Sequence, residues 1–168
     1  MDIQKNILIC VDNSDSSKQT VAYVAKIVSG KKGVRIRLFH VLQPMPPQLL
    51  EFGGSENPQE EEKLEEKQKN AQAEWQRKAE QDAQAGFLRA RAILAKGRIP
   101  SKSVETQTLC CPGDENLADD IISEALTNKC GTVVVGRHFF SWLDRIFSYH
   151  VADKLIRKGE GLAIWVVE

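Results

Sequence analysis

The sequence lacks an excess of charge of either sign. Its 168 residues include 23 Lys and Arg and 23 Asp and Glu, so the formal net charge is zero. A neutral chain has no overall field that would recruit nucleic acid or an acidic membrane surface, and neither is expected as a partner. Charged residues make up 27% and apolar residues 42%, which is typical of a globular domain.

Long hydrophobic runs are also missing. No stretch approaches the roughly 20 apolar residues that cross a bilayer. The N-terminal stretch "MDIQKNILICVDNS" has an apolar run of only about six residues with acidic residues on both sides, unlike a secretory signal peptide. We therefore expect a cytoplasmic protein.

Cysteine is sparse and unsuitably spaced for a metal or redox site. The four cysteines lie at 10, 110, 111 and 130, and no pair has the C-x-x-C spacing of a zinc or thioredoxin-like motif. We expect buried or half-buried reduced thiols; the alternative is a redox sensor at the adjacent pair. No metal site is predicted.

Five short apolar runs are present instead, separated by segments with helical spacing. Strands that alternate with helices indicate a three-layer α/β domain with a mostly parallel sheet. Helices are expected over about 16–29 and 115–128, and one domain over 1–168. The runs are 6–11, 34–42, 103–111, 132–136 and 162–167.

The segment 43–96 is unusual. Pro and Gly predict a loop over 43–57. A straight helix over 58–96 would be about 58 Å long, whereas a compact domain of this length is only about 40 Å across. We therefore expect 83–95 to dock on the sheet. The charged part, 59–80, should project, fray or meet another subunit, and Trp75 is its candidate partner contact. The region 43–82 is thus an elaboration of the domain.

Polar residues follow the first and fourth apolar runs. Asp12 comes directly after the first run, and Gly136 and Arg137 end the fourth. In an open parallel sheet, ligands bind beyond the carboxyl ends of the strands, where the strand order reverses. The sequence therefore predicts a site between these two strand ends. His40, inside the second run, is expected to be a structural histidine with its hydrogen bonds satisfied.

These motifs resemble the universal stress protein family over essentially the whole chain. The matching pieces are "ILICVDNSDSSKQTVAYVAKI", "IRLFHVL", "GDENLADDIISEAL" and "TVVVGR…HVADKLIRKGEGLAIWVV". The resemblance implies a five-stranded, mostly parallel sheet of order 3-2-1-4-5, in the fold class called adenine-nucleotide alpha-hydrolase-like or Rossmann-like. Many members bind ATP, and their nucleotide-binding roles would fall here on Asp12, Val41 and Gly136, with Arg137 adjacent.

The family's phosphate loop, G-x-x-G followed by nine residues and G-S or G-T, is altered here. Phe139 and Tyr149 replace its second and third glycines, and His150 replaces the hydroxyl residue. Glycine lets main-chain N–H groups approach phosphate, and these bulky residues would not. We therefore predict no cofactor and no ATP binding in the family manner. The alternative is an ATP-binding regulator or weak ATPase.

The resemblance also implies a homodimer, because family members pair through their last strand. Ile164, Trp165 and Val166 are the expected contacts. The aromatic loop after Gly136 either packs as core or offers a surface to a partner protein. The implied function is a stress-response module without enzymatic activity. A phosphoacceptor receiver domain is disfavoured, because the third run ends in Cys110, Cys111 and Pro112 and not in an acceptor Asp.

Overall fold

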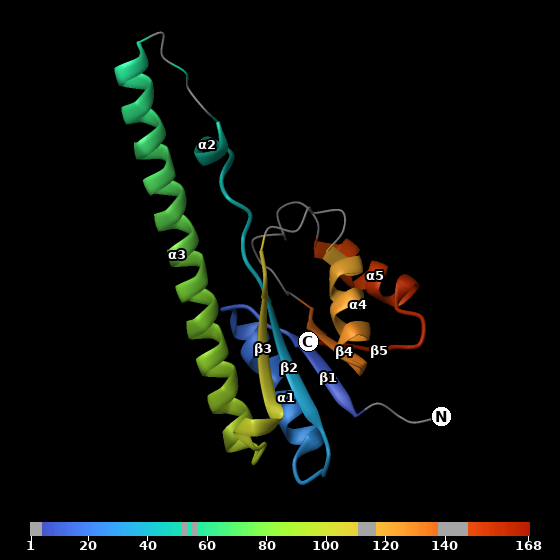
Figure 1. Ribbon diagram of the computed structural model, residues 1–168. Coiled ribbons are helices and arrows are strands. Elements are labelled where there is room, and N and C mark those ends of the chain that lie inside the picture. The colour runs from blue at the N-terminus through green and yellow to red at the C-terminus, as the bar shows by residue number, and fades with distance from the viewer. Residues whose placement is uncertain (1–4, 52–53, 55–56, 111–116, 138–147) are drawn as a thin grey trace.

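The protein is built on one parallel sheet of five strands. The computed structural model describes residues 5–51, 54, 57–110, 117–137 and 148–168, the last segment with side chains from Val151 onward. The strand order is β3-β2-β1-β4-β5 (Figure 1), as the resemblance to the family implied. The strands are β1 (Asn6–Cys10), β2 (Arg35–Val41), β3 (Val104–Leu109), β4 (Cys130–Gly136) and β5 (Ala163–Val167).

Helices cover both faces of this sheet. Alternate residues of β1 point to opposite sides, so Ile9 packs toward α1 and α3 while Leu8 packs toward α4 and α5. The result is the expected three-layer arrangement (Figure 1). The helices are α1 (Asp15–Val28), α2 (Pro47–Leu50), α3 (Pro58–Lys96), α4 (Leu117–Thr127) and α5 (Ser148–Lys158), with a 3₁₀ turn at Ser101–Ser103.

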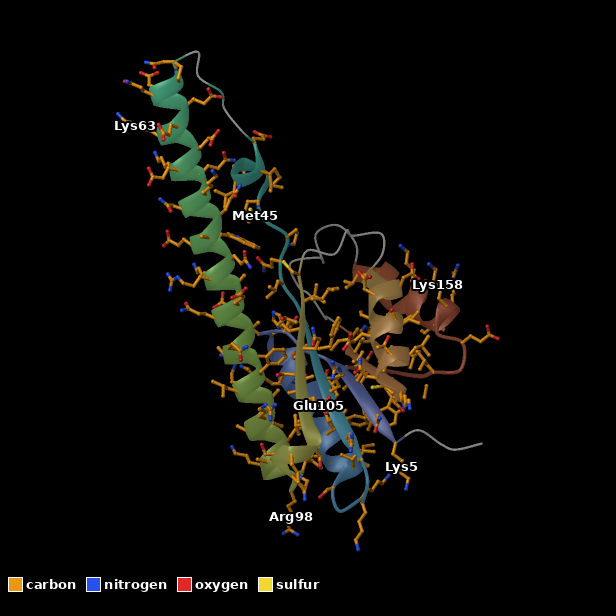
Figure 2. The ribbon with its side chains drawn as sticks, viewed as in Figure 1. Lys5, Met45, Lys63, Arg98, Glu105 and Lys158 are labelled. Atoms are coloured by element: carbon orange, nitrogen blue, oxygen red, sulfur yellow. The ribbon has the colours of Figure 1, made fainter. Side chains whose placement is uncertain are left out.

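The third helix differs from the sequence-based expectation, because it is one unbroken helix of 39 residues. Its second half docks on the sheet through a buried stripe that includes Phe87 and Leu94. Its first half projects past the sheet (Figure 1), and Figure 2 shows polar side chains around this half, with Lys63 near its start. The expected projection is therefore confirmed. The length argument against one helix was wrong, because a helix rich in Glu, Lys, Gln and Ala can extend beyond the domain.

A short helix lies beside the projecting half of α3. The loop expected over 43–57 contains α2, and the side chain of Gln72 donates to the Leu49 carbonyl at 2.6 Å. Gln68 donates to the carbonyls of Leu49 and Glu51, at 3.0 and 3.1 Å. The described part of the chain contains no helix long and apolar enough to cross a membrane.

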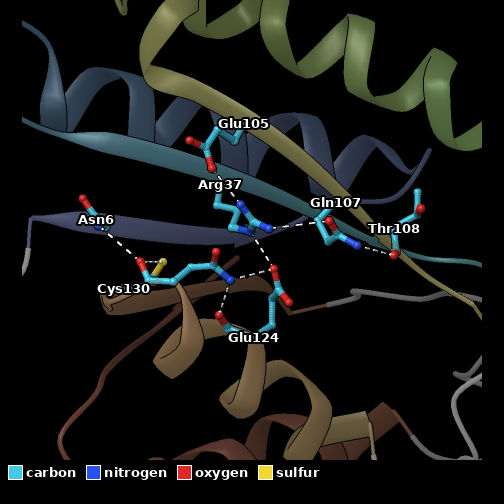
Figure 3. A network of polar contacts seen from close by, with 8 residues as sticks. Asn6, Arg37, Glu105, Gln107, Thr108, Glu124 and Cys130 are labelled. Atoms are coloured by element: carbon cyan, nitrogen blue, oxygen red, sulfur yellow. Dashed lines mark hydrogen bonds and ion pairs between the residues drawn. The ribbon is translucent and has the colours of Figure 1, made fainter.

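At the amino ends of the strands, an ion-pair network joins β2, β3 and α4 (Figure 3). Arg37 Nε lies 2.5 Å from Glu124, and its Nη1 lies 2.7 Å from Glu105. Burial raises the pKa of the adjacent Cys130 thiol to about 11. At neutral pH this thiol is therefore protonated and poorly reactive.

Candidate functional site

A polar hollow lies at the opposite edge of the sheet, beyond the carboxyl ends of β1 and β2. Its volume is about 510 Å³, within the range of about 300–1,000 Å³ typical of small-molecule sites. The ends of β1 and β2 and the middle of α3 form its walls. The described lining residues are Asp12, Asn13, Ser14, His40, Val41, Leu42, Gln43, Trp75, Lys78, Ala79 and Asp82.

Asp12 lies in this cavity, as predicted, and it also organises the start of α1. Its Oδ1 accepts hydrogen bonds from the backbone N–H of Ser14, at 2.9 Å, and from the Ser14 hydroxyl. Ser14 in turn caps the helix by accepting from the Ser17 N–H at 3.1 Å. The carboxylate is therefore oriented before any ligand arrives, and it gives this wall of the cavity a negative charge.

Asn13 connects the loop after β1 to α3. Its Nδ2 donates to the Asp82 carbonyl at 3.1 Å, and its Oδ1 accepts from Arg89. At this crossing α3 carries Gly86, where an added Cβ would lie 2.9 Å from Asn13 Oδ1. A glycine in α3 thus allows the helix to come close enough to wall the cavity.

The α3 wall was not predicted as part of the site. Trp75, Lys78 and Asp82 occupy one face of the helix and line the cavity. Their spacing of three and four residues was visible in the sequence, but it was interpreted as a solvated face or a partner contact. The half-buried Trp75 instead lies against the cavity, and a partner contact through it stays a prediction.

His40 corrects another expectation. It is 8% exposed, and its Nδ1 is a buried side-chain atom without a hydrogen-bond partner among the described residues. Burial lowers the pKa of His40, while the carboxylates of Asp12 and Asp82 and a backbone hydrogen bond with Val11 oppose that shift. The ring is therefore neutral at pH 7, and the expected full set of hydrogen bonds is wrong.

The structure places Val41 at the cavity but assigns Gly136 and Arg137 to other contacts. Val41 lines the cavity, although its side chain belongs to the core on the α4 side. A Cβ at Gly136 would lie 2.9 Å from Ser16 Oγ and 2.9 Å from Thr20 Oγ1, so this glycine lets α1 pack closely against β4. Arg137 pairs with Glu168, and its N–H donates to the Val167 carbonyl at 2.7 Å. Neither residue is among the described lining of the cavity.

The residues expected to disrupt the phosphate loop are not placed with their side chains. Phe139 lies outside the described residues, and Tyr149 and His150 lie in the first turn of α5, whose side chains are also outside them. Their effect on phosphate stays a sequence-based prediction.

Possible metal ligands and cysteines occur in the part of the chain that the structure describes. That part contains no group of three or more His, Cys, Asp or Glu arranged to hold a metal ion. Cys10 and Cys130 are free and buried, as expected, and burial raises the pKa of both thiols. Cys110 is exposed, contrary to expectation, and Cys111 lies outside the described residues.

Comparison with known proteins agrees with this architecture. The profile of the universal stress protein family matches residues 4–160, and the chain belongs to that family. A comparison with curated protein sequences gives no match.

Solved structures share the fold at low sequence identity. A universal stress family protein from Burkholderia pseudomallei superposes with a TM-score of 0.61 at 11% identity, covering 99% of this chain and 98% of its own. A universal stress protein from Archaeoglobus fulgidus in complex with dAMP gives 0.54 at 18%, covering 99% of each chain. Another in complex with cAMP gives 0.51 at 15%, covering 97% and 95%.

Proposed function

We propose that this universal stress protein is a cytoplasmic, non-enzymatic stress-response module that binds a nucleoside or nucleoside monophosphate. The observation that carries this proposal is the open cavity of about 510 Å³ between Asp12, Val41 and α3. Two structural neighbours were solved with dAMP and cAMP, ligands of the size that such a cavity accepts.

The charges of the cavity argue against a triphosphate. Asp12 and Asp82 contribute two carboxylates to the described lining, and Lys78 contributes one ammonium group. A triphosphate placed among an excess of carboxylates would meet like charge, which raises the free energy of binding. This agrees with the prediction from Phe139 and Tyr149 that family-type phosphate binding is lost.

A titration of the full chain tests this function. At a concentration of about 100 times its Kd, a ligand stabilises the folded state by about 2.7 kcal/mol. For a chain of this size, that corresponds to a rise in Tm of about 5–10 °C. We expect adenosine and AMP to produce such a rise and ATP with Mg²⁺ to bind no more tightly than AMP.

Two alanines of α3, each replaced by leucine, test whether the ligand binds in this cavity. Ala79→Leu adds bulk at a lining position and should abolish the response, whereas Ala73→Leu, on the exposed side of the same helix, should preserve it. The proposal fails if neither adenosine nor AMP shifts Tm in the wild-type protein.

An ATP-binding regulator or weak ATPase is the second candidate. The observation that favours it is again the cavity, because Asp12 and Val41 are the positions to which the resemblance assigns the nucleoside. Affinity for ATP more than about tenfold above that for AMP, or release of phosphate from ATP that Ala79→Leu abolishes, would establish this function instead.

We also propose a homodimer formed through β5. This strand is at the edge of the sheet, and its Val166 side chain is 43% exposed. An apolar edge strand is a ready template for pairing with a second chain. Trp165 packs edge-on against Tyr23 with ring centroids 6.5 Å apart, and Ile164 packs partly into the core, so Val166 is the most exposed of the three proposed contacts.

A further inference from the structure

Trp75 is a large aromatic side chain that serves neither hydrophobic core. It is half-buried and lines the cavity. Ala79, one turn later on α3, packs against the core between this helix and the sheet, whereas Trp75 packs against neither that core nor the one on the α4 side. No ring pair among the described residues includes it. The packing of the described domain therefore does not account for an indole ring at this position.

The cavity has room for a flat ring beside this indole. Trp75 and Ala79 lie on the same face of α3, and because Ala79 has only a methyl group, it leaves the space next to the indole open. The segment that follows β2 runs beside α3 (Figure 1), and Leu42 and Gln43 of this segment belong to the lining. A volume of about 510 Å³ is enough for a purine nucleotide.

The other apolar and aromatic residues of the described lining offer a ligand little surface. Val41 is 1% exposed, Leu42 is 4% exposed and the ring of His40 belongs to a residue that is 8% exposed. Ala79 contributes a single methyl group. Trp75 is therefore the side chain through which this cavity can make an extended contact with a flat, apolar part of a ligand.

We propose that Trp75 stacks on the base of the bound nucleotide and thereby favours purines over pyrimidines. Every base has a π-face that can stack on an aromatic side chain. A purine covers more of the indole than a pyrimidine does, so it removes more apolar surface from water. The inference rests on the proposed nucleoside site and adds the residue that recognises the base.

Three substitutions separate stacking from other roles of the ring. Trp75→Ala removes the ring and should weaken AMP binding by about 5- to 150-fold in calorimetric titration. Trp75→Phe keeps a flat aromatic face and should weaken binding by about threefold or less. Trp75→Leu keeps apolar bulk without a π-face, and it should bind AMP about 2- to 12-fold more weakly than Trp75→Phe, which is the part of an aromatic contact that exceeds its buried area.

Tryptophan fluorescence gives a readout that a purely structural role would not change. A base stacked on Trp75 should quench its emission, so AMP should lower the fluorescence of the wild-type protein. Trp75→Phe should still bind AMP but should lose this quenching. Trp165→Phe is the matched control, because Trp165 packs against Tyr23 near the other edge of the sheet, and it should keep the quenching. Equal quenching in the wild-type protein and Trp75→Phe would overturn the inference.

Selectivity for the base completes the test. The wild-type protein should bind AMP more tightly than UMP, and Trp75→Ala should reduce this preference. Trp75→Ala should unfold close to the wild-type Tm, because the ring serves neither core and alanine is the best helix former. Unchanged AMP affinity in Trp75→Ala, or an unchanged preference for AMP over UMP, would overturn the inference. Should Trp75→Ala fail to fold, the loss of quenching in Trp75→Phe decides.

These failures are distinguishable from failure of the proposed function. If the wild-type protein binds AMP and Ala79→Leu does not, a negative result with the Trp75 variants defeats this inference alone. If neither adenosine nor AMP binds the wild-type protein, the proposed function fails and the inference falls with it.

Discussion

Replacing Gly136 with alanine should destabilise the fold through one specific contact. The added Cβ would lie 2.9 Å from Ser16 Oγ and 2.9 Å from Thr20 Oγ1. Thr20 has no room to withdraw, because it is fully buried and its hydroxyl donates to the Ser16 carbonyl at 2.9 Å. The helix α1 must therefore move away from the end of β4, or its side chains must adopt strained rotamers.

The expected cost is the difference between two effects. Overpacking a dense core lowers the free energy of unfolding by about 1–3 kcal/mol. Alanine has less conformational freedom than glycine in the unfolded chain, which raises the free energy of unfolding by about 0.4–1 kcal/mol. A net loss of about 1–2 kcal/mol lowers Tm by about 2–8 °C for a domain of this size. Urea and thermal unfolding followed by circular dichroism would measure it.

The same substitution in a Ser16→Ala, Thr20→Ala background provides the control. Both oxygens are absent there, so Gly136→Ala should cost less than about 0.5 kcal/mol, and the difference is the coupling energy of the contact. An equal loss in both backgrounds, or no loss in either, would refute the view that this glycine exists for the approach of α1.

Three further outcomes are expected. Light scattering should show the proposed dimer for the wild-type protein and a monomer for Val166→Lys, because a lysine blocks an apolar edge strand; a wild-type monomer would refute the dimer, and a dimer that persists in Val166→Lys would place the interface elsewhere. Glu124→Gln should lower the free energy of unfolding, measured in urea, by about 1–3 kcal/mol, and Glu105→Gln should lower it by less than about 0.5 kcal/mol. Both acids pair with Arg37, but the Glu124 side chain is 21% exposed and the Glu105 side chain is 60% exposed. Equal losses would contradict this reasoning. Burial lowers the pKa of His40 below its ordinary 6.5. As the pH drops below about 6.5, His40 therefore takes up a proton in the unfolded chain before it does so in the folded protein, and the free energy of unfolding should fall. An equally steep fall in His40→Gln would show that other groups cause the pH dependence.

The sheet was predictable because its signal is local. A continuous β-branched run such as Val133–Val135 is typical of a strand that is buried on both faces. The observed strands agree with the predicted runs to within about two residues at each end. The strand order came from the resemblance to a family and not from the periodicity.

The wall formed by α3 was not predictable from local patterns. Whether Trp75 meets solvent, a partner or β2 depends on how far α3 slides along the sheet, and that register is set by distant contacts such as Asn13 with Asp82. The sequence carries the helix signal and the exposed charges, but both are compatible with several registers. The unpaired Nδ1 of His40 was missed for the same reason, because hydrogen-bond satisfaction depends on groups from other elements.

The residues that the resemblance placed at the site differ in how well the fold alone explains them. Asp12 holds the start of α1, and Gly136 admits α1 against β4, so each would be needed even in a protein that bound nothing. Their presence therefore cannot by itself establish a nucleotide. His40 is different, because the fold buries it and its Nδ1 has no hydrogen-bond partner among the described residues. A residue that breaks a local rule without structural gain is where function is expected. Trp75 is another such residue, because its half-buried ring packs against neither described core and lines the cavity, which makes it, more than the residues shared with the family motif, the place to test what this cavity holds.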